Sequence, residues 1–441
     1  MLTPLSLAEL RFSDLPLLLI LLLSGSHVLS QSVAEIYTVY LVAGLVAIAG
    51  MTRRVPRENI FLFLLAILAV GAVGTWSWPD KWNYIKISIG MCYVVLTSAL
   101  IIEFYHRDIR RMFRIYLTAG LVASVVGMFQ VAGYMAGISH VYNFRMSLGL
   151  NKWTLSPGGP FGLRLNSVYS EPSQFCIILS GCAFWAVYTL SFRQCSLLNT
   201  MKAVIILIAF CMTFSAMTVP ALMCASILVL TFSKANFTKY LQAIVVGGLL
   251  FAAFGISEIS DRADGVWGLV SGESRTSEVH GSSEILVTHM RAACYSVQRN
   301  PLFGAGLGMH QSVYWEYIFA SESSDLQRVD WNAADANSML LRVTSELGLI
   351  GVVGLGFLVY TGWISRQSDC DSLRIISCAF LCVITLQSIR QGNYFFNYFP
   401  LFFLLYLEAK RQTQPAALPH CRPEKPHRQS RRSRPTMATN R

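Results

Sequence analysis

Charged residues are scarce in this sequence: Asp, Glu, Lys and Arg make up 13% of its 441 residues, against about 25% in soluble domains. Apolar residues make up 54% and gather into runs such as Ile60–Thr75, Ile85–Ile102 and Leu241–Ile256. These runs approach the roughly 20 residues that cross a bilayer. The scarcity of charge therefore excludes an ordinary soluble domain and predicts an all-α, polytopic integral membrane protein.

Several catalytic and metal-binding patterns are also missing. The 11 cysteines contain no CxxC pair and the 8 histidines no HExxH pattern, so no metal site is predicted. The absence of a Gly-x-Ser-x-Gly elbow leaves acyl hydrolysis without support. Gly304, Gly306 and Gly308 alternate, but they do not form GxGxxG. We interpret them as a turn that needs the backbone freedom of glycine, and not as a nucleotide-binding loop.

The apolar runs predict about twelve transmembrane helices and one long connection. Residues 1–257 would contain nine helices and a medium loop at 136–171, residues 258–338 a long loop, and residues 339–410 the last three helices. Residues 411–441 have the composition of a disordered basic tail. Long loops are often functional, which makes 258–338 a candidate functional segment. The predicted helices cover 12–29, 33–51, 59–76, 84–104, 115–135, 172–191, 203–218, 219–233, 241–257, 339–363, 374–389 and 394–409.

The formal net charge is +11, and the positions of the basic residues along the chain agree with the expected topology. Lys and Arg gather in the basic tail and in the even-numbered connections, and such residues accumulate on the cytoplasmic side of membranes. Both termini are therefore predicted to be cytoplasmic, with loops 136–171 and 258–338 outside. The tail is expected to touch anionic membrane lipids, and nucleic acid is not expected as a partner.

A first candidate site lies at the end of the medium loop, where Arg164 is followed by Glu171 and Pro172. Proline suits the first turn of a helix, so Glu171 is predicted at a helix N-terminus on the membrane boundary. One interpretation is a charged cap, which the helix dipole favours by about 0.3–1 kcal/mol. The other is a carboxylate that orients an arginine or accepts a proton from a substrate hydroxyl.

A second candidate site lies where the long loop ends. The spacing of Asp335, Met339, Arg342 and Glu346 places them on one helix face, and Arg342 and Glu346 can pair at i, i+4. Ionisable groups near hydrocarbon normally face the bundle or a wet cavity. The sequence leaves two interpretations open: an internal ion pair that locks two helices, or a polar cavity beneath the long loop.

Further cations are predicted on the exterior side, against the usual charge bias. Arg291 lies on a predicted amphipathic helix at about 285–298, Arg299 follows it, and Arg390 lies at the outer end of a predicted span. His310 is on the same side. An anionic substrate would explain these arginines, because a guanidinium fork matches phosphate.

Three of these patterns, taken in order, resemble the Wzy-type O-antigen polymerases of the O-antigen ligase/polymerase superfamily. The resemblance extends over most of residues 30–410. The ligases commonly carry a histidine where this chain has Ala336, which favours a polymerase and leaves Glu171 or His310 as possible bases. The patterns are Arg164 to Glu171-Pro-Ser173, Arg291 to Asn300-Pro-Leu-Phe-Gly-Ala-Gly-Leu-Gly308, and Ala336-Asn337-Ser338 to Glu346-Leu-Gly-Leu-Ile-Gly351.

The resemblance implies a fold similar to the C-type glycosyltransferases and a reaction on the periplasmic side of the bacterial inner membrane. A growing glycan would pass from undecaprenyl diphosphate to the non-reducing end of a lipid-linked repeat unit. The reaction would need no metal or other cofactor, and a chain-length regulator protein would be a partner. The alternatives are an O-antigen ligase acting on lipid A-core and a transporter of lipid-linked glycan.

The resemblance, together with the predicted positions of the charged residues, suggests roles for nine residues. Fixed cations would stabilise the charge that develops on the departing diphosphate, and a base on the acceptor hydroxyl would add about 10²–10⁴-fold. The candidate catalytic residues are Glu171, Arg291 and Glu346. The candidate substrate-binding residues are Arg164, Arg299, His310, Asn337, Arg342 and Arg390.

Overall fold

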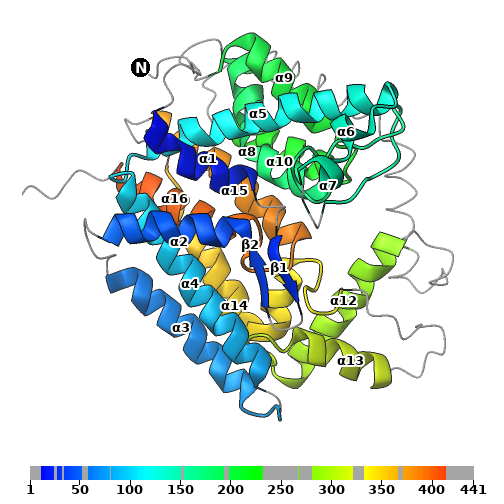
Figure 1. The fold of residues 1–441 in the computed structure, drawn as a ribbon. Coiled ribbons are helices and arrows are strands. Elements are labelled where there is room, and N and C mark those ends of the chain that lie inside the picture. The colour runs from blue at the N-terminus through cyan, green and yellow to red at the C-terminus, as the bar shows by residue number, and fades with distance from the viewer. Residues whose placement is uncertain are drawn as a thin grey trace, which may run out of the picture.

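The computed structural model is a predominantly helical bundle (Figure 1). It describes residues 11–23, 27–31, 34–51, 58–79, 81–148, 150, 153–192, 198–231, 267, 281–320, 332–365 and 371–413. The predicted helix at 241–257, most of 258–280, residues 321–331 and the tail beyond 413 lie outside this part.

In chain order the described elements are η2 (Phe12–Asp14), α1 (Leu15–Leu22), β1 (His27–Gln31), β2 (Ala34–Tyr37), α2 (Thr38–Met51), α3 (Glu58–Thr75), α4 (Trp82–Phe104), α5 (Ile109–Met135), α6 (Ser139–Tyr142), α7 (Phe144–Ser147), α8 (Pro172–Ser191), α9 (Thr200–Cys211), α10 (Thr218–Leu230), α12 (Gly281–Arg299), α13 (His310–Ala320), α14 (Met339–Gly362), α15 (Asp371–Arg390), η4 (Phe396–Tyr398) and α16 (Phe399–Arg411).

Five helices among these are long and apolar enough to cross a membrane: α4, α5, α8, α14 and most of α15. Five further apolar helices in the described part are shorter. The transmembrane character predicted from the apolar runs is therefore supported, and the number of twelve spans stays a prediction. The amphipathic helix predicted at 285–298 is present as α12.

The first predicted helix, 12–29, is wrong beyond Leu22. The chain instead forms an antiparallel hairpin, in which His27 is opposite Tyr37 and Gln31 is opposite Ala34. The apolar run stops at Leu23 and is followed by Ser, Gly, His and Gln, so it is too short to span a bilayer. The last predicted helix also starts later, at Phe399.

Contacts between distant segments bring several helix ends together. Arg111 at the start of α5 binds Asp14 at the start of α1, with Nε 2.8 Å from Oδ1. Arg107, just after α4, pairs with Glu408 near the end of α16 at 3.8 Å. These are the ends that the charge bias predicts on one side of the membrane. Which side faces the cytoplasm stays a prediction.

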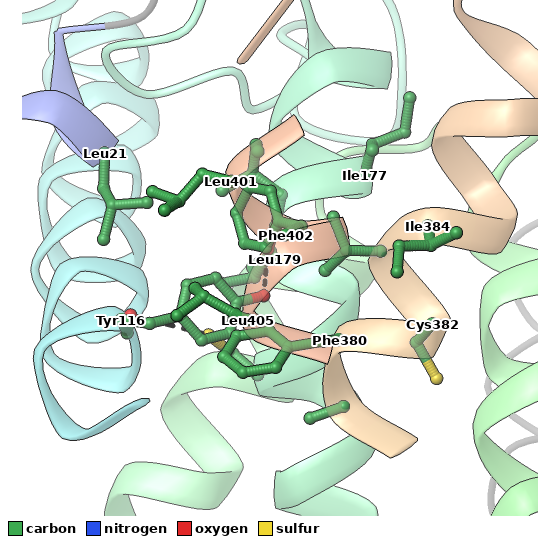
Figure 2. Close-up of a cluster of buried hydrophobic side chains, with 14 of the residues drawn as sticks. Leu21, Tyr116, Ile177, Leu179, Phe380, Cys382, Ile384, Leu401, Phe402 and Leu405 are labelled. Carbon is green, nitrogen blue, oxygen red and sulfur yellow. Dashed lines mark hydrogen bonds between the residues drawn. The ribbon is translucent and has the colours of Figure 1, made fainter. Parts of the chain in front are cut away.

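The centre of the bundle is built around α8, which packs against α9, α10 and α15. Figure 2 shows buried side chains from several helices meeting there, among them Tyr116, Phe380 and Phe402. The ring centroids of Tyr116 and Phe402 lie 5.6 Å apart at a steep angle, an arrangement that aromatic rings favour. At the crossing of α8 with α15, a Cβ on Gly181 would lie 2.6 Å from the carbonyl oxygen of Ala379, so close approach of the two backbones requires glycine.

Helix α14 is broken at Gly348, which has φ 58° and ψ −151°. The break exposes carbonyl groups that the glycine-rich run satisfies: the amide of Ala305 donates to Ser345 O at 2.9 Å and that of Gly306 to Glu346 O at 2.8 Å. Irregular backbone at membrane depth is tolerated where protein supplies such partners. Gly306 has a φ of 99°, so the run is a turn that needs glycine, as predicted.

Replacing Gly304 with alanine is expected to destabilise the protein by at least about 2 kcal/mol. Gly304 has a φ of 61°, and an added Cβ would lie 2.5 Å from Ser345 O and 2.7 Å from the amide nitrogen of Gly348. The added Cβ would have backbone atoms on both sides, and these atoms cannot move away without a large energetic cost. The measurement is the thermal unfolding midpoint in a fixed detergent. Gly356→Ala is the control, because this helical glycine of α14 has open space around it, and it should not lower the midpoint.

Candidate functional site

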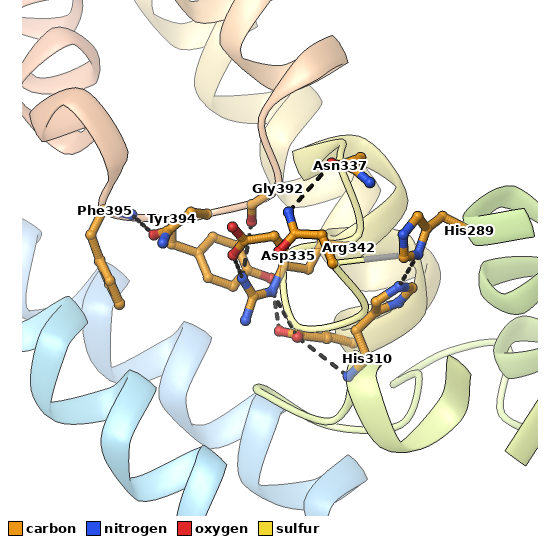
Figure 3. A network of polar contacts seen from close by, with 11 residues as sticks. His289, His310, Asp335, Asn337, Arg342, Gly392, Tyr394 and Phe395 are labelled. Carbon is orange, nitrogen blue, oxygen red and sulfur yellow. Dashed lines mark hydrogen bonds and ion pairs between the residues drawn. The ribbon is translucent and has the colours of Figure 1, made fainter. Parts of the chain in front are cut away.

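The first turns of α14 carry a buried polar network (Figure 3). Ser338 caps the helix and accepts a hydrogen bond from the amide of Leu341. Arg342 Nε lies 2.9 Å from Glu346 Oε1, and Arg342 Nη1 lies 3.5 Å from Asp335 Oδ1. The predicted i, i+4 pair is therefore confirmed. Glu346 is fully buried and lies about 10 Å along the helix from the start of α14.

The segment between α15 and α16 completes this network. Arg342 Nη1 donates to the carbonyl oxygen of Gly392 at 3.1 Å, and the Tyr394 hydroxyl donates to Glu346 Oε2 at 2.9 Å. The guanidinium carbon of Arg342 lies 4.7 Å from the Tyr394 ring centroid. Both carboxylate oxygens of Glu346 are thus engaged. This suits a residue that holds its neighbours in place better than one that takes up a substrate proton.

Glu171 lies at the N-terminus of α8, as predicted, but its side chain does not cap the helix. Its Oε1 accepts hydrogen bonds from Ser173 Oγ at 2.5 Å and from Gln391 Nε2 at 3.3 Å. Within the described residues, Oε2 makes no hydrogen bond, and the residue is only partly buried. One oxygen is held in place and the other is available, which is the arrangement a general base requires.

Three neighbouring residues join the two candidate sites that the sequence suggested separately. Gln391 contacts Glu171, the Gly392 carbonyl accepts from Arg342, and Tyr394 contacts Glu346. This segment was not predicted as part of a site from the sequence. The one available signal was the polar run Gln-Gly-Asn after Arg390, which ends α15 and would have indicated a turn.

His289 and His310 form a buried pair behind this network. His289 Nδ1 lies 3.0 Å from His310 Nε2, and both residues are fully buried. The backbone amide of His310 donates to Glu346 Oε1 at 3.4 Å. Burial, with smaller contributions from His289 and the charge of Arg342, lowers the pKa of His310 well below its usual range. His310 is therefore a neutral residue that ties α12 and α13 to α14.

Acidification is expected to loosen the packing of α12 and α13 against α14. The unfolded form takes up a proton at a pKa of about 6.5, whereas the folded form resists protonation of His310. The contribution to stability is complete above about pH 6.5 and falls at lower pH by about 1.4 kcal/mol per pH unit. Amide hydrogen exchange of α12 and α13 between pH 7.5 and 5.5 measures it. His310→Phe should flatten the dependence, and an equal slope in both proteins would contradict the assignment.

Two predicted substrate-binding arginines are engaged elsewhere. Arg299 pairs with Glu316 of α13 and lies over the Tyr295 ring, 5.5 Å from its centroid. Arg164 lies in the loop before α8, where its Nε donates to Thr213 O at 3.4 Å. These contacts tie Arg299 to α13 and Arg164 to the segment before α10.

The remaining predicted residues are close in the chain to residues of the network or of the histidine pair. Arg390 is the last residue of α15, directly before Gln391, and makes no hydrogen bond or ion pair within the described part of the chain. Asn337 precedes the N-cap of α14 with a φ of 49° and accepts a hydrogen bond from Asn332 Nδ2 at 3.4 Å. Arg291 is half-buried on α12, two residues after His289.

Among the residues that the structure describes, no group of three or more His, Cys, Asp or Glu side chains could hold a metal ion. In comparisons with known proteins, no family model and no curated protein matches this chain. The function of the chain is therefore inferred from the resemblance in the sequence patterns and from the geometry of the site.

Proposed function

We propose that this protein is a membrane glycosyltransferase that polymerises lipid-linked polysaccharide repeat units on the periplasmic side of the bacterial inner membrane. One observation carries the proposal: two of the segments on which the family resemblance depends contact each other directly, and the third is linked to them through the segment after α15. Glu171 reaches α14 through Gln391 and Gly392, and the glycine-rich run binds the backbone of Ser345 and Glu346. Patterns that lie far apart in the sequence are thus linked in the fold, which supports the proposal that they serve one site.

The proposed reaction needs a base for the acceptor and cations for the leaving group. Glu171 Oε2 takes the proton of an acceptor sugar hydroxyl while the hydroxyl oxygen forms a bond to the anomeric carbon of the growing glycan. The bond from that carbon to the diphosphate breaks, and its electron pair stays on the phosphate oxygen. Arg390, with Arg291 from α12, stabilises the diphosphate charge, usually the largest catalytic contribution.

The buried residues have a different role in this proposal. Arg342 and Tyr394 both donate to Glu346, and Arg342 also donates to the Gly392 carbonyl, so these residues fix the segment that carries Gln391. Gln391 in turn holds Glu171. We therefore assign Arg342 and Glu346 to positioning, with Glu171 and Arg390 in contact with substrate.

Reconstitution of the purified protein in lipid nanodiscs tests the proposal. The substrate is the lipid-linked repeat unit extracted from producing cells in which this gene is deleted. A ladder of lengthening lipid-linked glycans, formed without added divalent metal, is the expected result. If glycan appears only when lipid A-core is supplied, the protein is a ligase. The buried position of His310 beside His289 gives no replacement for the histidine that ligases carry at the place of Ala336.

A further inference from the structure

Gln387 of α15 is a buried polar residue that the site described above does not use. Its exposed fraction is 1%, and neither Oε1 nor Nε2 has a hydrogen-bond partner within the described residues. Folded proteins satisfy the large majority of buried side-chain polar atoms, and an exception calls for an explanation. A carboxamide with both ends unpaired is a strong exception, because it offers two donors and one acceptor.

Two contacts show which way Gln387 faces. A Cβ on Gly181 of α8 would lie 3.1 Å from Val383 Cγ2, and Gln391 donates to Glu171 at the start of α8. Residues four apart share one helix face, and Gln387 lies four residues after Val383 and four before Gln391. Its side chain therefore points into the seam between α8 and α15, one turn deeper than Glu171.

The α8 side of this seam is polar as well. Gln174 is buried, and its Oε1 accepts a hydrogen bond from Ser170 Oγ. It lies seven residues before Gly181, which meets α15, so it shares that face of α8. The seam thus carries the carboxamides of Gln174 and Gln387 one turn deeper than Glu171 and that of Gln391 beside it, and the α15 stripe of Val383, Gln387 and Gln391 contains no basic residue. Its chemistry differs from that of Arg390 and Arg291, which suit an anion.

We propose that this seam is the subsite for the acceptor sugar, a neutral polyhydroxyl group; the inference rests on the proposed function and names the substrate of its carboxylate. A sugar hydroxyl both donates and accepts, so adjacent hydroxyls match the donor and acceptor ends of an amide. The reacting hydroxyl binds Glu171 Oε2 and a neighbouring hydroxyl binds Gln387, whose flexible stem needs to reach up by about one helical turn, roughly 5.4 Å. The diphosphate is excluded, because the carboxylate repels it.

Gln387→Met tests the subsite, because it keeps the length of the side chain and removes the amide. The probes are the free repeat-unit oligosaccharide, released by mild acid from lipid-linked units, and undecaprenyl diphosphate. We expect at least tenfold weaker binding of the oligosaccharide to the variant in nanodiscs, with unchanged binding of undecaprenyl diphosphate. The thermal midpoint should not fall, because the amide has no hydrogen-bond partner among the described residues. Thr189→Val, which removes another buried unpartnered polar group at the far end of α8, should bind both probes normally.

The outcomes separate this subsite from the polymerase proposal. Three results would each overturn the subsite. The first is wild-type affinity of Gln387→Met for the oligosaccharide, and the second is a wild-type protein that does not bind the oligosaccharide. The third is a variant that loses binding of both probes together with thermal stability. Polymerisation by the wild type alongside any of these would leave the polymerase proposal standing. If oligosaccharide binding depends on Gln387 but the wild-type protein does not polymerise, the subsite stands and the polymerase proposal is rejected.

Discussion

Replacing Arg342 with leucine is expected to cost about 3–5 kcal/mol of stability, because it leaves the fully buried Glu346 carboxylate without its cation. The loss should exceed that of any exposed pair in the protein. Arg299→Leu is the matched control, because it breaks the Arg299–Glu316 ion pair, in which Arg299 is 56% exposed, and such pairs contribute about 0–1 kcal/mol. Thermal or denaturant unfolding in a fixed detergent measures both.

The double variant Arg342→Leu/Glu346→Leu separates a structural role from a functional one. Removing both charges abolishes the cost of an unpaired buried ion, so most of the stability should return. Chain extension should stay low, because Gly392 has lost the donor that fixes the segment beside Glu171. Recovery of full turnover together with stability would mean that the pair only locks helices, the first interpretation that the sequence left open.

Glu171→Gln is expected to lower kcat for chain extension by about 10²–10⁴-fold, the usual contribution of a general base. The amide keeps the shape and can still accept hydrogen bonds from Ser173 and Gln391, but it cannot take up a proton. Stability should change by less than about 1 kcal/mol, the range for a charge near a helix N-terminus. Single-turnover extension of lipid-linked repeat units measures the rate.

The comparison for Glu171→Gln is Glu316→Gln, the same substitution at a carboxylate of α13 that pairs with Arg299 away from the network. It should extend chains at the wild-type rate. Unchanged turnover in Glu171→Gln would reduce Glu171 to a charged residue at the start of α8. A large fall in the thermal midpoint would instead show that the carboxylate is needed for folding.

Local features of the site could be predicted from the sequence, because they depend on spacing along one helix or on one residue type. The Arg342–Glu346 pair follows from the i, i+4 rule, and the positive φ at Gly304 and Gly306 from the glycine-rich run. Composition likewise predicted apolar helices and an amphipathic α12. It failed between Leu22 and Thr38, where a short apolar run followed by polar residues gives a hairpin.

Only the tertiary structure decided which of the candidate residues meet. Glu171 and Gln391 are 220 positions apart, and Glu346 and Tyr394 are 48 apart, so no periodic pattern links them. The fold also gave Arg299 a partner in Glu316 and buried His310 against His289, although the sequence did not distinguish among the cations predicted on the exterior side. The physical reason is that hydropathy and spacing specify each helix separately, whereas the packing of α8, α14 and α15 determines which polar faces share a seam.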